Sequence, residues 1–293
     1  MSIYSKLNSL LTAANNKTGE SDTTLTDAVQ TLIDGYGQGG GGGNDDVLIT
    51  GQMGNNSYTF PQTSLGGCFA FSKGAFDLTM PNLTSITVDY ALQKSEIKSF
   101  SAPNLLTAQK WAFMQCTHLE TVDAQNMQTV GQYMFQGCSA LTKVFFPNST
   151  INDNAFENCT SLLTAVFGNI TTAWKQCANC TTLTACDIGT ATRLTNTFEG
   201  CSNLGTVILR QATSIIPMNN LDVFKNTPFK SGGSGGTIYI PKALYDHLGD
   251  GTSLDYKAAT NWSTYEGYGT ITWAKIEGSQ YATHYADGTV IPT

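Results

Sequence analysis

Charged residues are scarce in this chain: Asp, Glu, Lys and Arg make up only 13% of its 293 residues, and acids outnumber bases 22 to 15. Clustered Lys and Arg, which neutralise phosphates, are missing, so we expect no nucleic-acid partner. No apolar run approaches the roughly 18 residues of a transmembrane helix, so we expect no membrane insertion. The initial stretch MSIYSKLNSLL is too polar for a signal peptide. The hydrophobic content of 41% nevertheless excludes a wholly disordered chain.

Motifs of common catalytic sites are also missing. The sequence has no G-x-S-x-G, no P-loop and no G-x-G-x-x-G between a strand and a helix. The three histidines share no ligand spacing, and the C-x-x-C motif at Cys177 and Cys180 lacks a second ligand pair. We therefore predict a non-enzyme with no catalytic residue, no cofactor and no metal site.

Cysteines recur at a fixed spacing. Cys116, Cys138, Cys159, Cys180 and Cys201 are 22, 21, 21 and 21 residues apart, which is typical of a repeat architecture. Each is preceded at three residues by Phe or Cys and followed at three residues by Leu, as in Phe113-x-x-Cys116-x-x-Leu119-x-x-Val122. Two further units lie upstream, with Lys94 and Ser72 in the Cys position. Seven turns are therefore expected between about Phe69 and Pro217.

Each turn carries one short strand whose inward residues alternate with outward ones. All fourteen inward positions are apolar: Leu78/Met80, Phe100/Ala102, Val122/Ala124, Val144/Phe146, Ala165/Phe167, Cys186/Ile188 and Val207/Leu209. Because one turn cannot bury such a face alone, stacked turns must supply the core, as in a solenoid. Pro81, Pro103 and Pro147, each followed by Asn, should end their strands, since Pro cannot extend the ladder and Asn tolerates a left-handed turn.

The repeated unit AF-x-x-C-x-x-L-x-x-V resembles the BspA-like leucine-rich repeats. Residues 224–229 with 236–241 look like that family's closing unit, and residues 256–265 look like the helix that follows it. The resemblance implies an α/β solenoid with short parallel strands. In such a core, we expect the repeated cysteines to pack as small hydrophobic side chains and to form no disulfides.

The ends of the chain differ from the repeats. We predict a helical anchor or oligomerisation module over 1–36, a Gly-rich linker over 37–46, an N-terminal β cap containing a hairpin over 47–68, the solenoid over 69–230 and a C-terminal α+β cap over 231–293. In that cap, Tyr256, Trp262, Tyr265, Tyr268 and Trp273 either stack on sugars or, as we expect, pack the cap's core.

One outward column of the strands is the candidate binding surface. It consists of Ser101, Asp123, Phe145, Val166, Asp187 and Ile208, flanked by Lys143 and Arg210. An exposed apolar strip with polar flanks often marks a contact surface; alternatively, a loop or the C-terminal segment covers it. Asp123 and Asp187 lie three turns apart, roughly 14 Å, whereas paired glycosidase carboxylates lie about 5–9.5 Å apart.

The segments over residues 10–14 and 24–37 are similar to the N-termini of tail-associated structural proteins in phages and prophages of gut Firmicutes. This resemblance implies a homo-oligomeric virion protein, assembled in the bacterial cytoplasm, that contacts other tail proteins through residues 1–36. Its solenoid would bind a glycan or protein on the host surface, as a receptor-binding or tail-fibre protein does. The alternatives are a BspA-like adhesin on the bacterial cell surface and a polysaccharide-degrading tailspike.

Overall fold

The computed structural model describes residues 57–59, 63–65, 69–170 and 174–276. The chain divides into two units between Asn44 and Asp45, and all of the described residues belong to the second. The predicted helices over 1–36, the linker over 37–46 and the first strand of the predicted hairpin lie outside the described residues.

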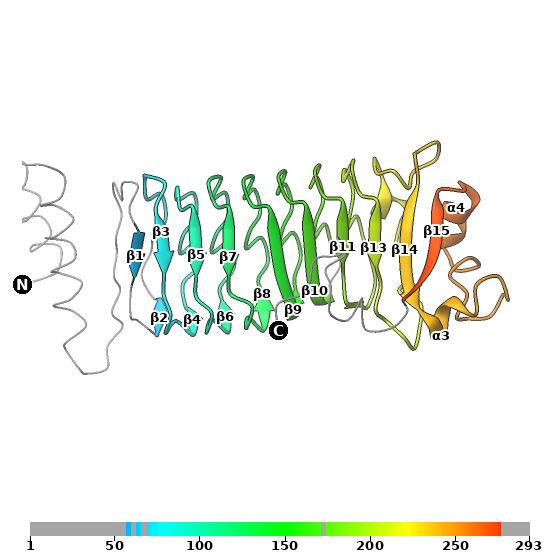
Figure 1. Ribbon diagram of the computed structural model, residues 1–293, viewed down its shortest axis with the longest axis horizontal. Coiled ribbons are helices and arrows are strands. Elements are labelled where there is room, and N and C mark those ends of the chain that lie inside the picture. The colour runs from blue at the N-terminus through cyan, green and yellow to red at the C-terminus, as the bar shows by residue number, and fades with distance from the viewer. Residues whose placement is uncertain (1–56, 60–62, 66–68, 171–173, 277–293) are drawn as a thin grey trace, which may run out of the picture. The chain divides into compact units, whose positions relative to one another are not determined.

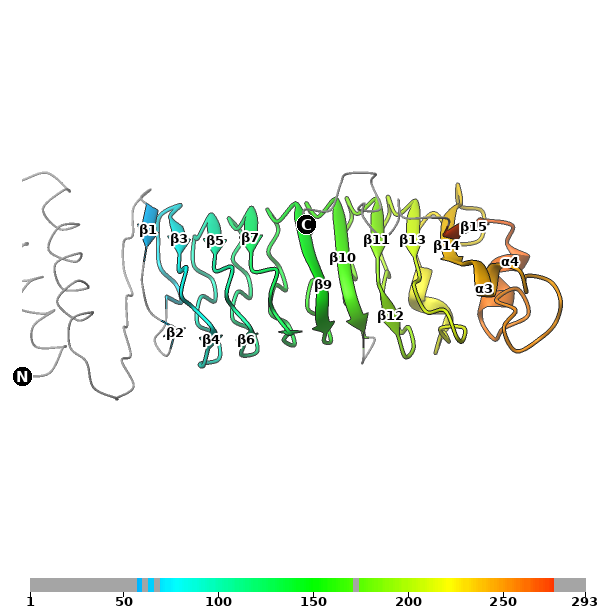
Figure 2. The same ribbon diagram turned by 60° about the horizontal axis from the view of Figure 1, so that its bottom comes forward.

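The strands form two rows in which every pairing is parallel (Figures 1 and 2). The first row is a four-stranded sheet of β1 (Ser57–Thr59), β3 (Asp77–Thr79), β5 (Ser99–Ser101) and β7 (Thr121–Asp123). The second row begins with β2 (Ser64–Leu65), β4 (Ser85–Ile86), β6 (Thr107–Ala108) and β8 (Thr129–Val130). Since β1 pairs in parallel with β3, the solenoid ladder extends to residue 57, earlier than predicted.

Two longer strands join the rows. β9 (Lys143–Ile151) and β10 (Thr164–Ile170) pair along both halves, and the second half of β9 also pairs with β8. Figure 2 shows both strands running from one row to the other. The larger sheet continues through β11 (Ala185–Asp187), with β12 (Thr190–Ala191) on β10, and then through β13 (Thr206–Ile208), β14 (Gly236–Pro241) and β15 (Ile271–Ile276).

Through β11 and β12, each described turn therefore contributes two strand positions where the sequence predicted one. The second position spans only two residues in β2, β4, β6 and β8, which is too short for a period-two pattern. The prediction that the strand ends at Pro147 is wrong, because β9 continues through this residue. The register of the pairing with β10 shifts between Phe167 and Asn169. Asn104 is not left-handed; its amide donates to the Pro81 carbonyl of the preceding turn at 2.8 Å.

The predicted inward positions form the core. Thirteen of the fourteen are buried, and only Val122 is partly exposed. The Phe side chains stack from turn to turn, with ring centroids 5.1 Å apart for Phe113–Phe135 and 5.3 Å for Phe135–Phe156. Phe167, an inward strand residue of the same unit as Phe156, lies 5.2 Å from it, and Cys177 holds the Phe position of the next unit. Stacking in register thus builds an apolar column of rings across these turns.

The repeated cysteines form a second buried column. Seven described cysteines are free and buried, as core packing predicts. Thiols of the five repeat cysteines donate to carbonyls of the preceding turn at 2.9–3.1 Å: Cys116 to Leu92, Cys138 to Phe113, Cys159 to Phe135, Cys180 to Phe156 and Cys201 to Cys177. Upstream, the column continues with Ser95, whose hydroxyl lies 3.5 Å from the Cys116 sulfur, so the assignment of Lys94 to this position is wrong.

A glycine at the corner of one turn has no room for a side chain. Gly189 has a φ of +59°, and a Cβ there would overlap the backbone carbonyl oxygen of Gly168. Gly205, in contrast, has no atom closer to its ideal Cβ than the Thr184 carbonyl oxygen at 3.8 Å. We expect Gly189→Ala to lower the free energy of unfolding by at least about 2 kcal/mol. Gly205→Ala is the matched control, and urea denaturation of both variants measures the difference; equal midpoints would contradict the corner geometry.

The C-terminal cap closes the solenoid with a strand, two short helices and a final strand (Figure 1). α3 covers Lys242–Tyr245, and α4 covers Trp262–Gly267, later than the predicted helix over 256–265. A 3-10 helix, Leu221–Phe224, precedes the cap. Tyr256, Trp262 and Tyr265 are buried, which confirms core packing for these three. Within the described ranges, none of the helices has the length and apolar character needed to cross a membrane.

Candidate functional site

The predicted outward column exists but is only partly exposed. The ladders pair Phe145 with Val166, Val166 with Asp187, and Asp187 with Ile208, as predicted. Val166, Asp187 and Ile208 are nevertheless 3% exposed or less, so of the two alternatives the covered strip holds at these positions. Asp123 and Lys143 are exposed, and Phe145 and Arg210 are half-buried. Whether any of these residues binds a ligand stays a prediction.

Asp187 is committed to an ion pair. The Arg210 guanidinium donates to one carboxylate oxygen at 2.7 Å from Nε, with Nη2 at 2.5 Å, and the Gly189 backbone N–H donates to the other at 3.0 Å. Burial raises the pKa of Asp187, and the adjacent Arg210 opposes that rise. These two residues of the predicted column therefore neutralise each other in a largely desolvated position.

Replacing Arg210 would leave the buried Asp187 carboxylate without its cationic partner. We expect Arg210→Ala to lower the free energy of unfolding by about 2–3 kcal/mol, below the roughly 3–5 kcal/mol of a fully buried pair because Arg210 is 29% exposed. In the variant, the folded state takes up a proton at higher pH than the unfolded chain, whose Asp pKa is about 3.9. The loss should therefore shrink as the pH falls toward 4 in urea titrations. A loss independent of pH would contradict the role assigned to Asp187.

A column of partly exposed aromatic side chains lies elsewhere on the solenoid: Tyr90 is 39% exposed, and Trp111 and Tyr133 are half-buried. Tyr90, Trp111 and Tyr133 occur in successive turns, and their rings are nearly parallel. The centroids are 4.8 Å apart for Tyr90–Trp111 and 6.0 Å for Trp111–Tyr133. Their spacings of 21 and 22 residues follow the repeat. All three aromatic residues stand two positions before a core Leu or Phe, and from this position the sequence could have predicted the column.

The backbone under this column is left-handed. Tyr90, Trp111 and Tyr133 have φ values of 61°, 58° and 55°, and the next two turns place Asn154 and Lys175 at the same position. Bulky residues cost roughly 1–2 kcal/mol in this conformation, whereas Asn tolerates it. The left-handed backbone therefore belongs to the repeat, and the three aromatic residues occupy it in place of residues that adopt it more easily.

A hollow of about 410 Å³ begins where the aromatic column ends. It is lined by Tyr133, Asp153, Asn154, Glu157, Trp174 and Lys175, which come from three successive turns. Trp174 is 56% exposed. Its backbone N–H donates to Asp153 Oδ1 at 3.2 Å, and its carbonyl accepts from the Asn154 backbone N–H at 2.9 Å, so the main chain is held between turns while the indole projects outward.

The polar groups of the hollow are ordered by one another. Glu157 is nearly buried, and its Oε2 accepts from Gln136 Nε2 at 2.7 Å and from Asn154 Nδ2 at 2.9 Å. Lys175 Nζ lies 3.7 Å from Glu157 Oε1. The hollow thus presents acceptors and a cationic donor between aromatic side chains, the mixture found in small-molecule sites.

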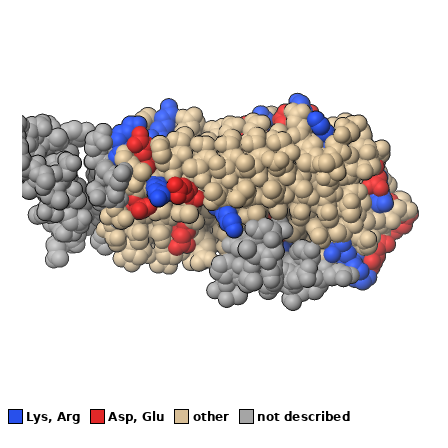
Figure 3. Space-filling model, turned by 45° about the horizontal axis from the view of Figure 1, so that its top comes forward, with Lys and Arg blue, Asp and Glu red and all other residues tan. Residues whose placement is uncertain are grey.

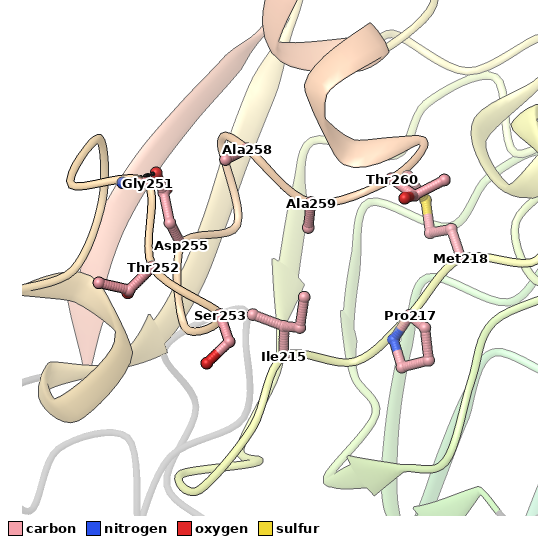
Figure 4. Close-up of a pocket in the computed structure, with 10 residues that line it drawn as sticks. All are labelled: Ile215, Pro217, Met218, Gly251, Thr252, Ser253, Asp255, Ala258, Ala259 and Thr260. Atoms are coloured by element: carbon pink, nitrogen blue, oxygen red, sulfur yellow. Dashed lines mark hydrogen bonds between the residues drawn. The ribbon is translucent and has the colours of Figure 1, made fainter.

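A second hollow, of about 430 Å³, lies in the C-terminal cap (Figure 4). It opens between the segment with Ile215, Pro217 and Met218 and the loop that carries Gly251–Thr260. Asp255 accepts from the Gly251 backbone N–H at 3.0 Å and from the Lys257 N–H at 2.9 Å. Although burial acts to raise it, these backbone donors lower the pKa of Asp255. Its carboxylate therefore holds the loop and is not available to a ligand.

Charge contributes little to the face shown in Figure 3. Lys, Arg, Asp and Glu gather toward the two ends of the described part, and the turns between them carry few charged side chains on this face. The described residues contain no cluster of three or more His, Cys, Asp or Glu that could hold a metal ion. A ligand of this face would be recognised by shape and hydrogen bonds more than by net charge.

Stacked parallel strands with buried Phe, Cys and Leu columns define a solenoid of the leucine-rich repeat class. A family model described as a BspA type leucine rich repeat region, in six copies, matches residues 56–163 and 149–242, more than half of the chain. The chain therefore belongs to the BspA-type leucine-rich repeat family, and the predicted fold class is confirmed.

Among solved structures, the chain is similar to a leucine-rich repeat protein from Bacteroides ovatus ATCC 8483. The likeness covers 73% of this chain and 70% of that chain, at 15% identity and a TM-score of 0.28. Because this TM-score is low, the family of the chain follows from the match to the BspA type repeat model alone. None of the curated proteins matches the chain. The similarity of residues 10–37 to phage tail proteins is not tested by these matches and stays a prediction.

Proposed function

We propose that this protein is a non-catalytic binding protein whose solenoid recognises a glycan or protein on a cell surface. The observation that carries the proposal is the partly exposed aromatic column of Tyr90, Trp111 and Tyr133 with the adjoining hollow. Aromatic side chains contribute large contact area with little loss of conformational freedom, so they are enriched at recognition surfaces.

A non-catalytic role is supported by the state of Asp187. Of the two acids of the predicted column, Asp187 is engaged by Arg210 and the Gly189 N–H, and Asp123 lies three turns away. A carboxylate locked in a buried ion pair is a poor general acid or base because its proton affinity is set by its partner.

Two settings fit such a binding protein. A BspA-like adhesin displayed on a bacterial surface agrees with the family of the repeats. A phage or prophage tail protein is the second candidate, favoured by the sequence order of a helical pattern over 1–36, the glycine run over 37–43 and then the solenoid. In that setting, residues 1–36 contact other tail proteins and other copies of this chain.

The binding proposal is tested with the full-length protein, labelled with a fluorophore and added to intact bacterial and host cells. We expect saturable binding that is lost when Tyr90 and Trp111 are both replaced by Ala and retained in Tyr268→Ala, an exposed aromatic residue of the cap. Periodate treatment of the cells abolishes binding to a glycan, and protease treatment abolishes binding to a protein. Absence of saturable binding to every cell type would overturn the proposal.

The setting is decided by localisation of the native protein. Antibody labelling of intact cells without phage induction supports the adhesin, and immunogold labelling of purified particles supports the tail protein. Label on neither surface would contradict both settings.

A further inference from the structure

We propose that the hollow between Tyr133 and Trp174 binds a single sugar ring of a neutral glycan. This inference rests on the proposed function and names the ligand class of one place on the solenoid. At the end of the aromatic column, the Tyr133 ring stacks on the Trp111 ring of the preceding turn, with centroids 6.0 Å apart and an angle of 14° between the ring planes. Its opposite ring face is therefore directed toward the following turn.

No ring follows Tyr133 in the column, because Asn154 holds the next position. The Asn154 amide is turned to Glu157, with Nδ2 2.9 Å from Oε2. The other aromatic residue that lines the hollow is Trp174, two turns beyond Tyr133 and one residue before Lys175, which holds the column position in that turn. The two aromatic side chains thus lie on different turns of one hollow of about 410 Å³, which has room for one six-membered ring.

The polar groups of the hollow match hydroxyl groups. A pyranose has C–H groups that pack on aromatic rings and hydroxyls that both donate and accept hydrogen bonds. Asp153 supplies an acceptor beyond the oxygen used by the Trp174 N–H, and Lys175 supplies a donor. Hydrogen-bond donors and acceptors that lie side by side suit a ligand whose groups both donate and accept hydrogen bonds.

The competing ligand class is a quaternary ammonium group, which aromatic residues with nearby carboxylates also bind. Lys175 argues against it, because its ammonium group lines the same hollow and would repel a cation. Glu157 is in addition engaged by Gln136, Asn154 and Lys175. Asp153 adds a second carboxylate to the lining, so a cation is the competing ligand that the test below has to separate from a sugar.

The test is saturation-transfer NMR on the full-length protein with a panel of neutral methyl glycosides, hexoses and N-acetylhexosamines, at millimolar concentration. We expect transfer to at least one glycoside and at least tenfold weaker binding in Trp174→Ala. Phe71→Ala is the matched control, because Phe71 is also 56% exposed but lies in an early turn, and it should bind like the unmodified protein. Asp153→Asn keeps an oxygen for the Trp174 N–H and should weaken binding several-fold without unfolding the turn.

Absence of transfer to every glycoside overturns the inference, as does equal affinity in Trp174→Ala. Binding of tetramethylammonium chloride in place of the glycosides also overturns it, in favour of a cationic ligand. The failures are distinguishable: cell binding that persists in Trp174→Ala contradicts the hollow alone, whereas glycoside binding without any cell binding contradicts the proposed function alone.

Discussion

In the native protein, iodoacetamide is expected to modify at most one of the eight cysteines, whereas all eight should react after unfolding in guanidinium chloride. Seven described cysteines are buried, and the five of the repeat donate their thiol protons to carbonyls of the preceding turn. Burial raises the pKa of the Cys138, Cys159 and Cys201 thiols. Because the thiolate is the reactive form, burial suppresses access at all seven described cysteines and ionisation in addition at these three.

Intact mass spectrometry counts the labels directly. The eighth cysteine, Cys68, lies outside the described residues, so Cys68→Ser is the control that should reduce the native count to zero. Labelling of several repeat cysteines in the native state would contradict the stacked core, and so would a bound metal ion released by a chelator.

The second large effect is expected from Phe146→Ala. Phe146 is 1% exposed, and its ring centroid lies 6.0 Å from that of Phe135 and 6.1 Å from that of Phe156. Truncation removes buried apolar surface and leaves a cavity that neighbouring rings of a regular stack cannot fill. We expect a loss of about 3–5 kcal/mol in the free energy of unfolding, measured by urea denaturation.

Leu163→Ala is the control, because Leu163 lies in the same part of the solenoid but is 43% exposed. Its effect should stay within about 0.5 kcal/mol. Turns of a solenoid interact mainly with their neighbours, so hydrogen exchange should also rise most in the turns next to Phe146. An unchanged midpoint for Phe146→Ala would show that the inward assignment is incorrect.

The repeat made much of the fold predictable. Each inward position needs an apolar side chain, and each turn meets an almost identical neighbour, so Phe, Cys and Leu recur at one spacing that is visible in the sequence. For the same reason, Cys177 and Cys180 could be assigned to the core, where the structure places them. The errors lie where the local signal was short, as at Ser95, one residue from the expected Lys94, and in the two-residue strands of the second row.

The candidate site was harder to predict because exposure is a property of what packs over a residue. Val166 and Asp187 stand in the predicted outward column, yet both are buried. Conversely, Tyr90, Trp111 and Tyr133 follow the repeat spacing, but their sequence positions do not tell whether the rings face the core or solvent. Only the structure shows them as one stacked column that is partly exposed to solvent.

The sequence by itself determined that turns of 21 or 22 residues stack on an apolar interior, because that interior must be built from every turn alike. The tertiary structure alone decided which outward side chains remain accessible and which of them meet at the hollow. The hollow brings together Tyr133 and Trp174, and the ion pair joins Asp187 to Arg210. In both cases the residues come from different turns, so their proximity depends on how the turns are superposed and not on the residues within any one turn.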